Sequence, residues 1–217
     1  MTPRRKSGRP VKVPGEKNTK EKIFDAAVEL FAERGYDGVS VRDIAAAVGI
    51  KESSIYKHYS CKEEILEMIL EYPTRRIETT GPQDMKTEEL IVTLGPERFM
   101  AMGGDLITAW VDEPRMEKIF RVICVELYHN ERVKTFYKMF MDLTLSFWAN
   151  IFALMRKHEF IKTADPEVLA FEYISFYGNL FMDYFLVRYG RTSGSFRQEY
   201  QQVIERHTAF MVNAIKP

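Results

Sequence analysis

The chain has 217 residues, of which 46% are hydrophobic and 29% charged, and these values suit a folded protein of one or two domains. Its two cysteines, Cys61 and Cys124, are too few for a disulfide framework and lack CxxC spacing, so we expect a reducing, cytoplasmic environment. No apolar run reaches the roughly 18 residues of a membrane helix, and the N-terminus lacks the apolar segment of a secretory signal. We therefore expect neither export nor a membrane anchor.

The positive and negative charges balance overall but are unevenly distributed. Lys plus Arg and Asp plus Glu each number 31, whereas residues 1–62 hold 13 basic and 8 acidic residues. The first 18 residues combine many bases with prolines and glycines, which predicts a disordered basic arm over residues 1–18. Charge alone leaves open whether this arm binds nucleic acid or is a solubilising tail.

A domain of short helices is predicted over residues 19–65. Apolar residues recur at helical spacing across residues 19–34, and Gly35 interrupts the pattern as a helix cap does. Ser40 and Asp43 have the spacing of a capping box, which predicts the start of a second helix.

The second predicted helix ends at Gly49, and a third begins at about residues 51–53. This third helix turns Ile55 and Tyr59 inward and leaves a polar face outward. Two short helices joined by a glycine turn indicate a helix-turn-helix, although ordinary helical bundles contain similar pairs. The adjoining basic arm favours the helix-turn-helix interpretation.

Residues 24–66 carry a family resemblance, with the sequence FDAAVELFAERGYDGVSVRDIAAAVGIKESSIYKHYSCKEEIL. This stretch resembles the N-terminal domain of the tetracycline-repressor-like (TetR) family of transcription regulators. It departs from the family pattern at Lys51, Ser53 and Cys61, and a capping box of Ser60 with Glu63 is expected to replace the usual cap of the fourth helix. The resemblance implies an all-α protein that binds double-stranded DNA as a homodimer and is not an enzyme.

The candidate DNA-binding residues lie at the start of the second helix, along the third and at the start of the fourth. A recognition helix enters the major groove with its first residues against base edges, while neighbouring polar groups hold phosphates. On this basis Lys51 to Ser54 read bases, and the phenol of Tyr56 matches the family position that holds a phosphate. The full predicted set is Ser40, Arg42, Lys51, Glu52, Ser53, Ser54, Tyr56, His58 and Lys62.

Two of these residues have alternative interpretations. Glu52 either accepts a hydrogen bond from a cytosine amino group or pairs with Lys51 or Lys57, and we favour the ion pair. His58 either touches the DNA backbone or packs against the first helix.

Residues 66–217 are predicted to form a helical domain for effector binding and dimerisation, since they show helical periodicity and no strand alternation. Proline and glycine punctuation, including Pro73, divides them into segments. The expected helices span residues 62–78, 86–94, 97–111, 114–129, 131–158, 165–189 and 195–215.

The last two helices are expected to form the dimer interface. The 165–189 segment is apolar on more than one face, and the final helix carries a continuous apolar stripe. A palindromic operator requires a twofold protein, and four helices from two copies would supply it. Burial of both helices within one monomer is the alternative. The predicted interface residues are Tyr173, Gly178, Phe185, Val203, His207 and Phe210.

The middle helices are rich in aromatic and methionine side chains. Spacing alone favours an ordinary core, whereas the resemblance implies a pocket for a small effector, which with this lining would be apolar or aromatic. The predicted lining residues are Trp110, Phe120, Cys124, Phe140, Phe147, Trp148, Tyr177 and Phe181. The sequence leaves open whether four acidic residues meet a cation there or face solvent: Asp105, Glu126, Asp142 and Asp183.

The sequence contains no glycine-rich phosphate loop, GxSxG elbow or HExxH motif. Glu126 and His129 form one Glu-x-x-His pair, but a di-iron bundle needs two such pairs, so we interpret this pair as an exposed helix end. Cys61 is interpreted as an incidental cap rather than an oxidant sensor. We expect no catalytic residue, metal site or cofactor. The alternatives are a regulator of this fold without an effector, and an all-helical enzyme or partner-binding bundle.

Overall fold

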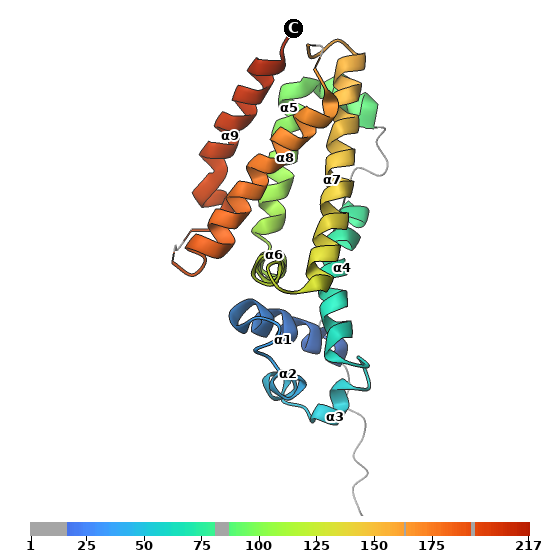
Figure 1. Ribbon diagram of the computed structural model, residues 1–217, viewed down its shortest axis with the longest axis vertical. Helices are drawn as coiled ribbons and strands as arrows, with labels where there is room; N and C mark the ends of the chain where they lie inside the picture. Colours follow the sequence, from blue (N-terminus) through green and yellow to red (C-terminus); the bar gives the residue numbers. More distant parts are fainter. Residues whose placement is uncertain (1–16, 81–86, 163, 192–193) are drawn as a thin grey trace, which may run out of the picture.

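The computed structural model describes residues 17–80, 87–162, 164–191 and 194–217, which form an elongated helical molecule (Figure 1). No strand lies within these ranges, so the all-α class is confirmed. Most of the predicted arm, residues 1–18, lies outside the described residues. Within the same ranges, no helix combines the length and apolarity needed to cross a membrane.

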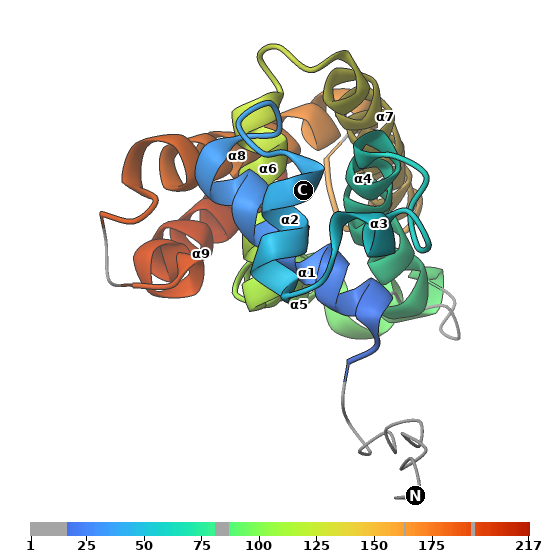
Figure 2. The same ribbon diagram turned by 90° about the horizontal axis from the view of Figure 1, so that it is seen from below.

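The first helices lie at one end of the molecule, where Figure 2 views them from below. Here α1 precedes the helix-turn-helix pair α2 and α3, and α4 leads away toward the other helices. The bounds are α1 (Thr19–Arg34), α2 (Val41–Val48), α3 (Glu52–Ile55) and α4 (Lys62–Thr80).

Local hydrogen bonds fix the beginnings of α1 and α2. Asn18 and Glu21 form a capping box at α1, and Ser40 and Asp43 form the predicted one at α2. Gly49 then ends α2 with φ +74° and ψ 32°, in the left-handed region that glycine adopts without steric cost. These caps confirm the predicted boundaries of the helix-turn-helix.

A compact apolar core holds the first three helices together. Ile23 and Phe31 of α1 are fully buried, and Ile44 of α2 packs with them. Ile55 and Tyr59 also turn inward, each with no more than 2% of its surface exposed, as predicted. The hydroxyl of Tyr59 donates to the carbonyl of Lys20 at 3.2 Å, which ties the segment after α3 to the start of α1.

The remaining elements form the larger domain. Their bounds are α5 (Thr87–Val111), α6 (Pro114–Glu126), α7 (Glu131–Lys157), α8 (Pro166–Met182), the π-helix η1 (Asp183–Arg188) and α9 (Phe196–Ile215). The long α7 runs beside α8, and α5 packs against α9 (Figure 1). A cluster of aromatic rings fills the space between α7 and α8, with the ring centroids of Trp148 and Tyr173 only 4.3 Å apart.

The expected helix boundaries agree with the structure at two places and differ at a third. Pro73 lies buried inside α4, which runs to Thr80 and so matches the expected span of residues 62–78. Gly95 takes the non-helical angles φ +72° and ψ 166° just before Pro96 and divides α5 into two parts, at the division expected between residues 94 and 97. The 165–189 segment is α-helical only to Met182 and then widens into η1.

Candidate nucleic-acid interface and cavities

The predicted base-reading residues lie on the surface at the tip of the helix-turn-helix. Lys51, Glu52 and Ser53 are exposed and Ser54 is half-buried. The phenol of Tyr56 is 51% exposed and makes no hydrogen bond with any described residue. An exposed phenol without a partner has its donor available for a ligand oxygen.

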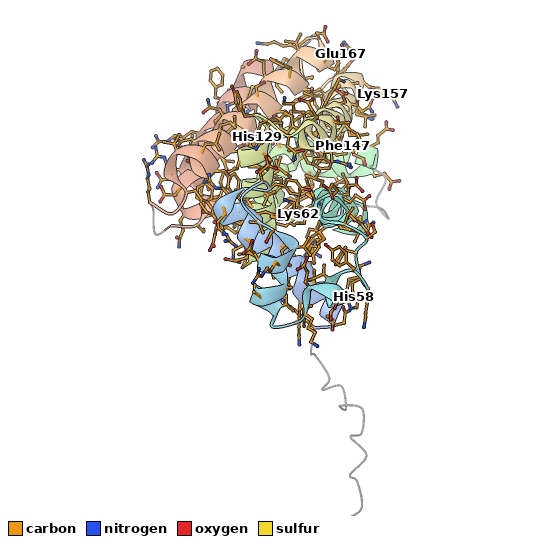
Figure 3. All side chains as sticks on the ribbon, turned by 60° about the horizontal axis from the view of Figure 1, so that its bottom comes forward. His58, Lys62, His129, Phe147, Lys157 and Glu167 are labelled. Carbon is orange, nitrogen blue, oxygen red and sulfur yellow. The ribbon has the colours of Figure 1, made fainter. Side chains whose placement is uncertain are left out.

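Residue His58 lies close to this tip, at the end of the molecule opposite Glu167 (Figure 3). His58 is half-buried, which leaves both interpretations of its role open. Glu52 forms no ion pair with Lys51 or Lys57 within the described residues, so the favoured pairing is wrong in this structure. All three side chains are exposed.

Ser40 is occupied by its capping interactions. Its hydroxyl donates to the carboxylate of Asp43 at 2.5 Å, and its backbone N–H donates to the same oxygen at 2.8 Å. These bonds, first the one from the hydroxyl, lower the pKa of Asp43. Because the hydroxyl proton is committed, Ser40 can position the start of α2 but would donate to a phosphate only by releasing Asp43. The neighbouring Arg42 is exposed.

Lys62 is also engaged within its own domain. Its Nζ donates to the carbonyls of Tyr36 and Val39, at 3.0 Å each, and lies 3.9 Å from the centroid of the Tyr36 ring. Lys62 therefore fastens the turn between α1 and α2 to the start of α4. Only one ammonium hydrogen is left for a phosphate, so its predicted DNA contact remains a hypothesis.

The cap before α4 differs from the prediction by one residue. Ser60 pairs with Glu64, not with Glu63: its hydroxyl donates to the Glu64 carboxylate at 2.8 Å, and its backbone N–H donates to the same oxygen. These two bonds, the backbone one first, lower the pKa of Glu64. A spacing of four places the carboxylate over the cap as effectively as the expected spacing of three.

Helix α6 joins the two domains through three polar contacts with α1 and the turn after it. Arg115 pairs with Asp25 at 2.7 Å, and Lys118 pairs with Glu29. Further along, a carboxylate oxygen of Glu126 accepts the backbone N–H of Tyr36 at 2.7 Å. Residue numbers increase in the same direction along both segments of these contacts. Helix α6 therefore runs parallel to α1 and contacts it along its length.

Glu126 corrects our sequence interpretation of an exposed helix end, because only 1% of it is exposed. Nε2 of His129 lies 3.1 Å from its second oxygen, but not in hydrogen-bond geometry. The burial had a sequence signal, since Glu126 follows the apolar run of residues 122–125. A buried carboxylate that accepts a backbone N–H from another domain is a fixed point between the two domains.

The predicted pocket stays a prediction, and several of its residues pack in the core. Phe120 and Phe181 pack together with ring centroids 5.3 Å apart, and Phe147 is 47% exposed on α7. Burial raises the pKa of the Cys124 thiol to about 12, as expected of a core cysteine. None of the eight predicted lining residues lines either of the two cavities described below.

Two of the acidic residues left open by the sequence have partners. Asp142 pairs with Lys138 at 2.6 Å on the surface of α7. Asp183 pairs with Arg188 and accepts the phenol of Tyr200 at 2.6 Å, which lowers its pKa. Within the described ranges, no group of three His, Cys, Asp or Glu residues could hold a metal ion.

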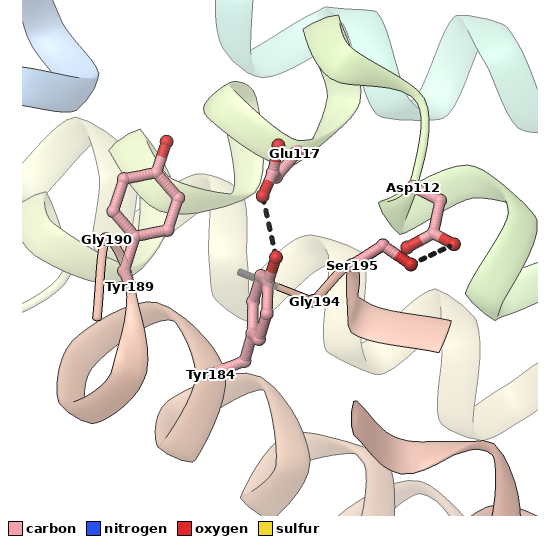
Figure 4. A pocket seen from close by; sticks show the side chains of 7 residues that line it. All are labelled: Asp112, Glu117, Tyr184, Tyr189, Gly190, Gly194 and Ser195. Atoms are coloured by element: carbon pink, nitrogen blue, oxygen red, sulfur yellow. Dashed lines mark hydrogen bonds between the residues drawn. The ribbon is translucent and has the colours of Figure 1, made fainter. Parts of the chain in front are cut away.

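Two cavities were missed by sequence reasoning. The first, about 430 Å³, lies where α5 meets α6 and where η1 approaches α9, and acidic and phenolic side chains line it (Figure 4). The second, about 640 Å³, lies at the kink of α5 and the end of α9 and is mainly apolar. Neither has a sequence signature, since their residues are brought together from distant segments.

The predicted dimer residues divide into two groups. The prediction that Tyr173 and Phe185 lie in the dimer interface is wrong, because both side chains are completely buried within one protomer. The remaining four stay predictions: the Cβ position of Gly178 faces open space, Val203 and Phe210 are 43% and 67% exposed, and His207 is half-buried. The ring of His207 stacks on Phe176 with centroids 3.7 Å apart, which occupies at least one of its faces.

The exposed face of α8 and η1 supplies further candidates. Phe171 and Met182 of α8 are 60% and 45% exposed, and Leu186 of η1 is 45% exposed. Together with Gly178 they recur at helical spacing and define one outward stripe. Sequence reasoning missed them because apolar residues cover both faces of this helix, and the inward set was chosen.

The fold and these surfaces define an all-helical, two-domain protein with an N-terminal helix-turn-helix. Residues 23–69 match the family described as bacterial regulatory proteins, tetR family. The N-terminal domain therefore belongs to the TetR family, as the resemblance indicated.

A curated relative supports this assignment in the same region. The negative transcriptional regulator IcaR of the biofilm operon icaADBC, from Staphylococcus epidermidis, is 50% identical over 52 residues. The match covers 24% of this chain and 28% of that protein, so the two chains are alike over only about a quarter of their length.

Solved structures extend the likeness to the whole fold. AibR in complex with isovaleryl coenzyme A and operator DNA has a TM-score of 0.61 at 18% identity, covering 86% of this chain and 96% of that chain. A regulator from Saccharomonospora viridis in complex with choline has a TM-score of 0.62 at 20% identity, covering 91% and 97%. At these identities, the comparison shows a shared fold.

Proposed function

We propose that this protein is a DNA-binding transcriptional regulator, a repressor that binds a palindromic operator as a homodimer and releases it when a small molecule binds the C-terminal domain. The observation that carries the proposal is the exposed polar surface at the start of α3, on a helix-turn-helix of the TetR family. Its named relative is a negative regulator of transcription, which favours repression.

The roles proposed for individual residues follow from their geometry. Lys51, Glu52 and Ser53 are exposed where α3 would enter a major groove, so they would read bases. Tyr56 would donate its phenol to a phosphate. Ser40 and Lys62 would act mainly by positioning α2 and the turn before it, through the contacts described above.

Dimerisation would bring α8 and α9 of two copies together. The exposed apolar side chains of α8 and α9 form a surface that water solvates poorly, and a twofold contact would bury it. Such a dimer presents two recognition helices to half-sites about 34–36 Å apart. A single helix-turn-helix contacts too few base pairs to bind specifically.

Switching would depend on the two links between the domains. Helix α4 continues directly from the DNA-binding domain, and α6 holds α1 through Arg115, Lys118 and Glu126. A ligand that favours another position of α6 would change the separation of the two recognition helices. A change of that separation would prevent simultaneous contact with both half-sites.

The test begins with selection of bound sequences from random duplex DNA, followed by titration of the selected duplex at several salt concentrations. We expect a palindromic consensus and an affinity that falls steeply with salt. Tyr56→Phe should weaken binding by about tenfold, because a phenol bonded to a charged phosphate contributes about 1.5 kcal/mol. Tyr128→Phe is the matched control, since Tyr128 is 90% exposed on the C-terminal domain.

The dimer is tested separately by light scattering. Phe210→Glu should give monomers, because it places a charge on the proposed interface, whereas Met139→Glu should stay dimeric, since Met139 is similarly exposed on α7. A monomeric wild-type protein that selects no sequence would contradict the proposal.

A further inference from the structure

The acidic cavity at the amino end of α6 has a restricted chemistry. Asp112, Glu117, Tyr184, Tyr189 and Ser195 line it together with two glycines (Figure 4). Among these lining residues none is basic. Its volume of about 430 Å³ lies in the range of small-molecule sites, roughly 300–1,000 Å³. The cavity therefore has room for a small ligand, and its described lining residues offer acidic, phenolic and hydroxyl groups.

The two carboxylates of the cavity are bonded to neutral donors. Asp112 accepts the hydroxyl of Ser195 at 3.0 Å and the backbone N–H of Arg197 at 3.1 Å. Glu117 accepts the phenol of Tyr184 at 2.8 Å. Neither carboxylate forms an ion pair with a described Lys or Arg, so both negative charges stay uncompensated by a cation.

Two of the three nearby positive side chains are occupied elsewhere, and the third, Arg121, lies against the ring of Tyr189. Lys118 pairs with Glu29, and the guanidinium of Arg197 donates to the carbonyl of Asp105 and the hydroxyl of Thr108. The amino ends of α6 and α9 each supply about half a positive charge, and together with Arg121 they offset part of the charge of the two carboxylates. Burial first and then Glu117 raise the pKa of Tyr189, whereas Arg121 lowers it.

Two aromatic walls complement the negative charge. The rings of Tyr184 and Tyr189 stand perpendicular, at 89°, with centroids 6.4 Å apart. Perpendicular aromatic rings beside carboxylates form the cages that bind quaternary ammonium groups, because the ring faces attract a cation that has no hydrogen bonds to give. The guanidinium of Arg121 already lies 4.8 Å from the centroid of the Tyr189 ring, so a ligand cation has to share this ring with Arg121 or displace it.

We propose that this cavity binds a small organic cation of the quaternary ammonium class and that its occupant is the effector of the regulator. The effector part rests on the proposed function, whereas the binding part does not. Glu117 lies on α6 between Arg115 and Lys118, the residues that hold α1. An occupant that draws Glu117 away from Tyr184 therefore acts on the helix that positions the DNA-binding domain.

Binding is tested on the full-length protein without DNA, using choline chloride and tetramethylammonium chloride. The neutral control is 3,3-dimethylbutan-1-ol, which has the shape of choline without its charge. We expect each cation to raise Tm by about 3 °C at ten times its Kd, and the alcohol to have no effect. An equal shift with the alcohol, a shift with Mg²⁺ alone, or no shift would overturn the proposal.

Variants then locate the site. Glu117→Gln and Asp112→Asn should each weaken choline binding about tenfold, while Asp142→Asn on α7 should leave it unchanged. Tyr189→Phe keeps the ring and should bind within about twofold of wild type, whereas Tyr189→Leu should bind at least threefold more weakly. Circular dichroism checks that each variant is folded. Unchanged affinity in both carboxamide variants and in Tyr189→Leu would place binding elsewhere and refute the proposal.

The effector role is tested by titrating the selected duplex with and without choline. We expect choline to weaken duplex binding at least fivefold in the wild type, and Glu117→Gln to need about ten times more choline for the same effect. Tight choline binding with unchanged duplex affinity would overturn the effector role alone. Failure to bind any duplex would overturn the proposed function instead, and the cation titration would still stand by itself.

Discussion

The two ends of this molecule are stabilised in different ways. The N-terminal end, with the helix-turn-helix, relies on caps between residues three or four apart: Asn18 with Glu21, Ser40 with Asp43, and Ser60 with Glu64. The C-terminal domain relies on aromatic contacts between distant segments, such as Trp148 with Tyr173. Short-range interactions are visible in a sequence, whereas contacts between distant segments require the fold. This difference explains why one end was predictable in detail and the other in outline.

The largest expected effect lies in the aromatic core of the C-terminal domain. Phe152 is completely buried between Trp148 and Tyr173, so Phe152→Ala should lower the free energy of unfolding by about 3–5 kcal/mol. Phe147→Ala, on the same helix but 47% exposed, should cost about 1 kcal/mol or less. Urea unfolding measures both. Equal losses would show that the core does not depend on packing at Phe152.

The next effect lies at the boundary between the two domains. Glu126→Ala should cost about 1–3 kcal/mol, because it leaves the buried N–H of Tyr36 without an acceptor. Glu126→Gln should cost less, since its amide oxygen still accepts that bond. Hydrogen exchange at the Tyr36 amide reports the contact directly. Full exchange protection in Glu126→Ala would exclude the role assigned to this carboxylate.

A smaller effect is expected at the start of α2. Ser40→Ala should lower stability by about 1 kcal/mol, because it removes the side-chain acceptor for the backbone N–H of Asp43. Ser40→Gly should cost only a few tenths of a kcal/mol, since glycine is tolerated at this position. Thermal unfolding of both variants decides the matter. A reversed order would show that the hydroxyl does not act as a cap.

The smallest expected effect is a difference in the pH dependence of stability between the two ends of the molecule. Burial lowers the pKa of His207 below its ordinary value of 6.5, so the unfolded chain takes up the proton first and stability falls as pH drops below about 6.5. The pKa values of Asp43 and Glu64 are also lowered, so their contribution is full above the ordinary carboxylate range and is lost at lower pH. Unfolding at pH 7, 5.5 and 4 resolves the two windows. His207→Gln should flatten the first window only.

The sequence predicted the residues of the helix-turn-helix because their signals are local. Gly35, Ser40 and Gly49 mark helix ends whatever lies around them. The role of Lys62 was harder to predict, because its partners Tyr36 and Val39 are more than twenty residues away. The cavity beside Glu117 had no signal at all, since η1 and the start of α9 reach it only through the fold. Tyr173 and Phe185 were expected at the dimer interface, but both are buried. Helical spacing identifies two apolar faces of this segment and does not say which of them turns outward.

The π-helical segment η1 also sets the tolerance of this chain to changes in length. A π-helical turn accommodates one more residue than an α-helical turn, so deleting one residue there would restore ordinary helical geometry. The deletion would rotate every following side chain by about 100° and turn Tyr184 away from Glu117. An insertion or deletion before Asp183 should therefore disturb α9 far more than one at Arg191.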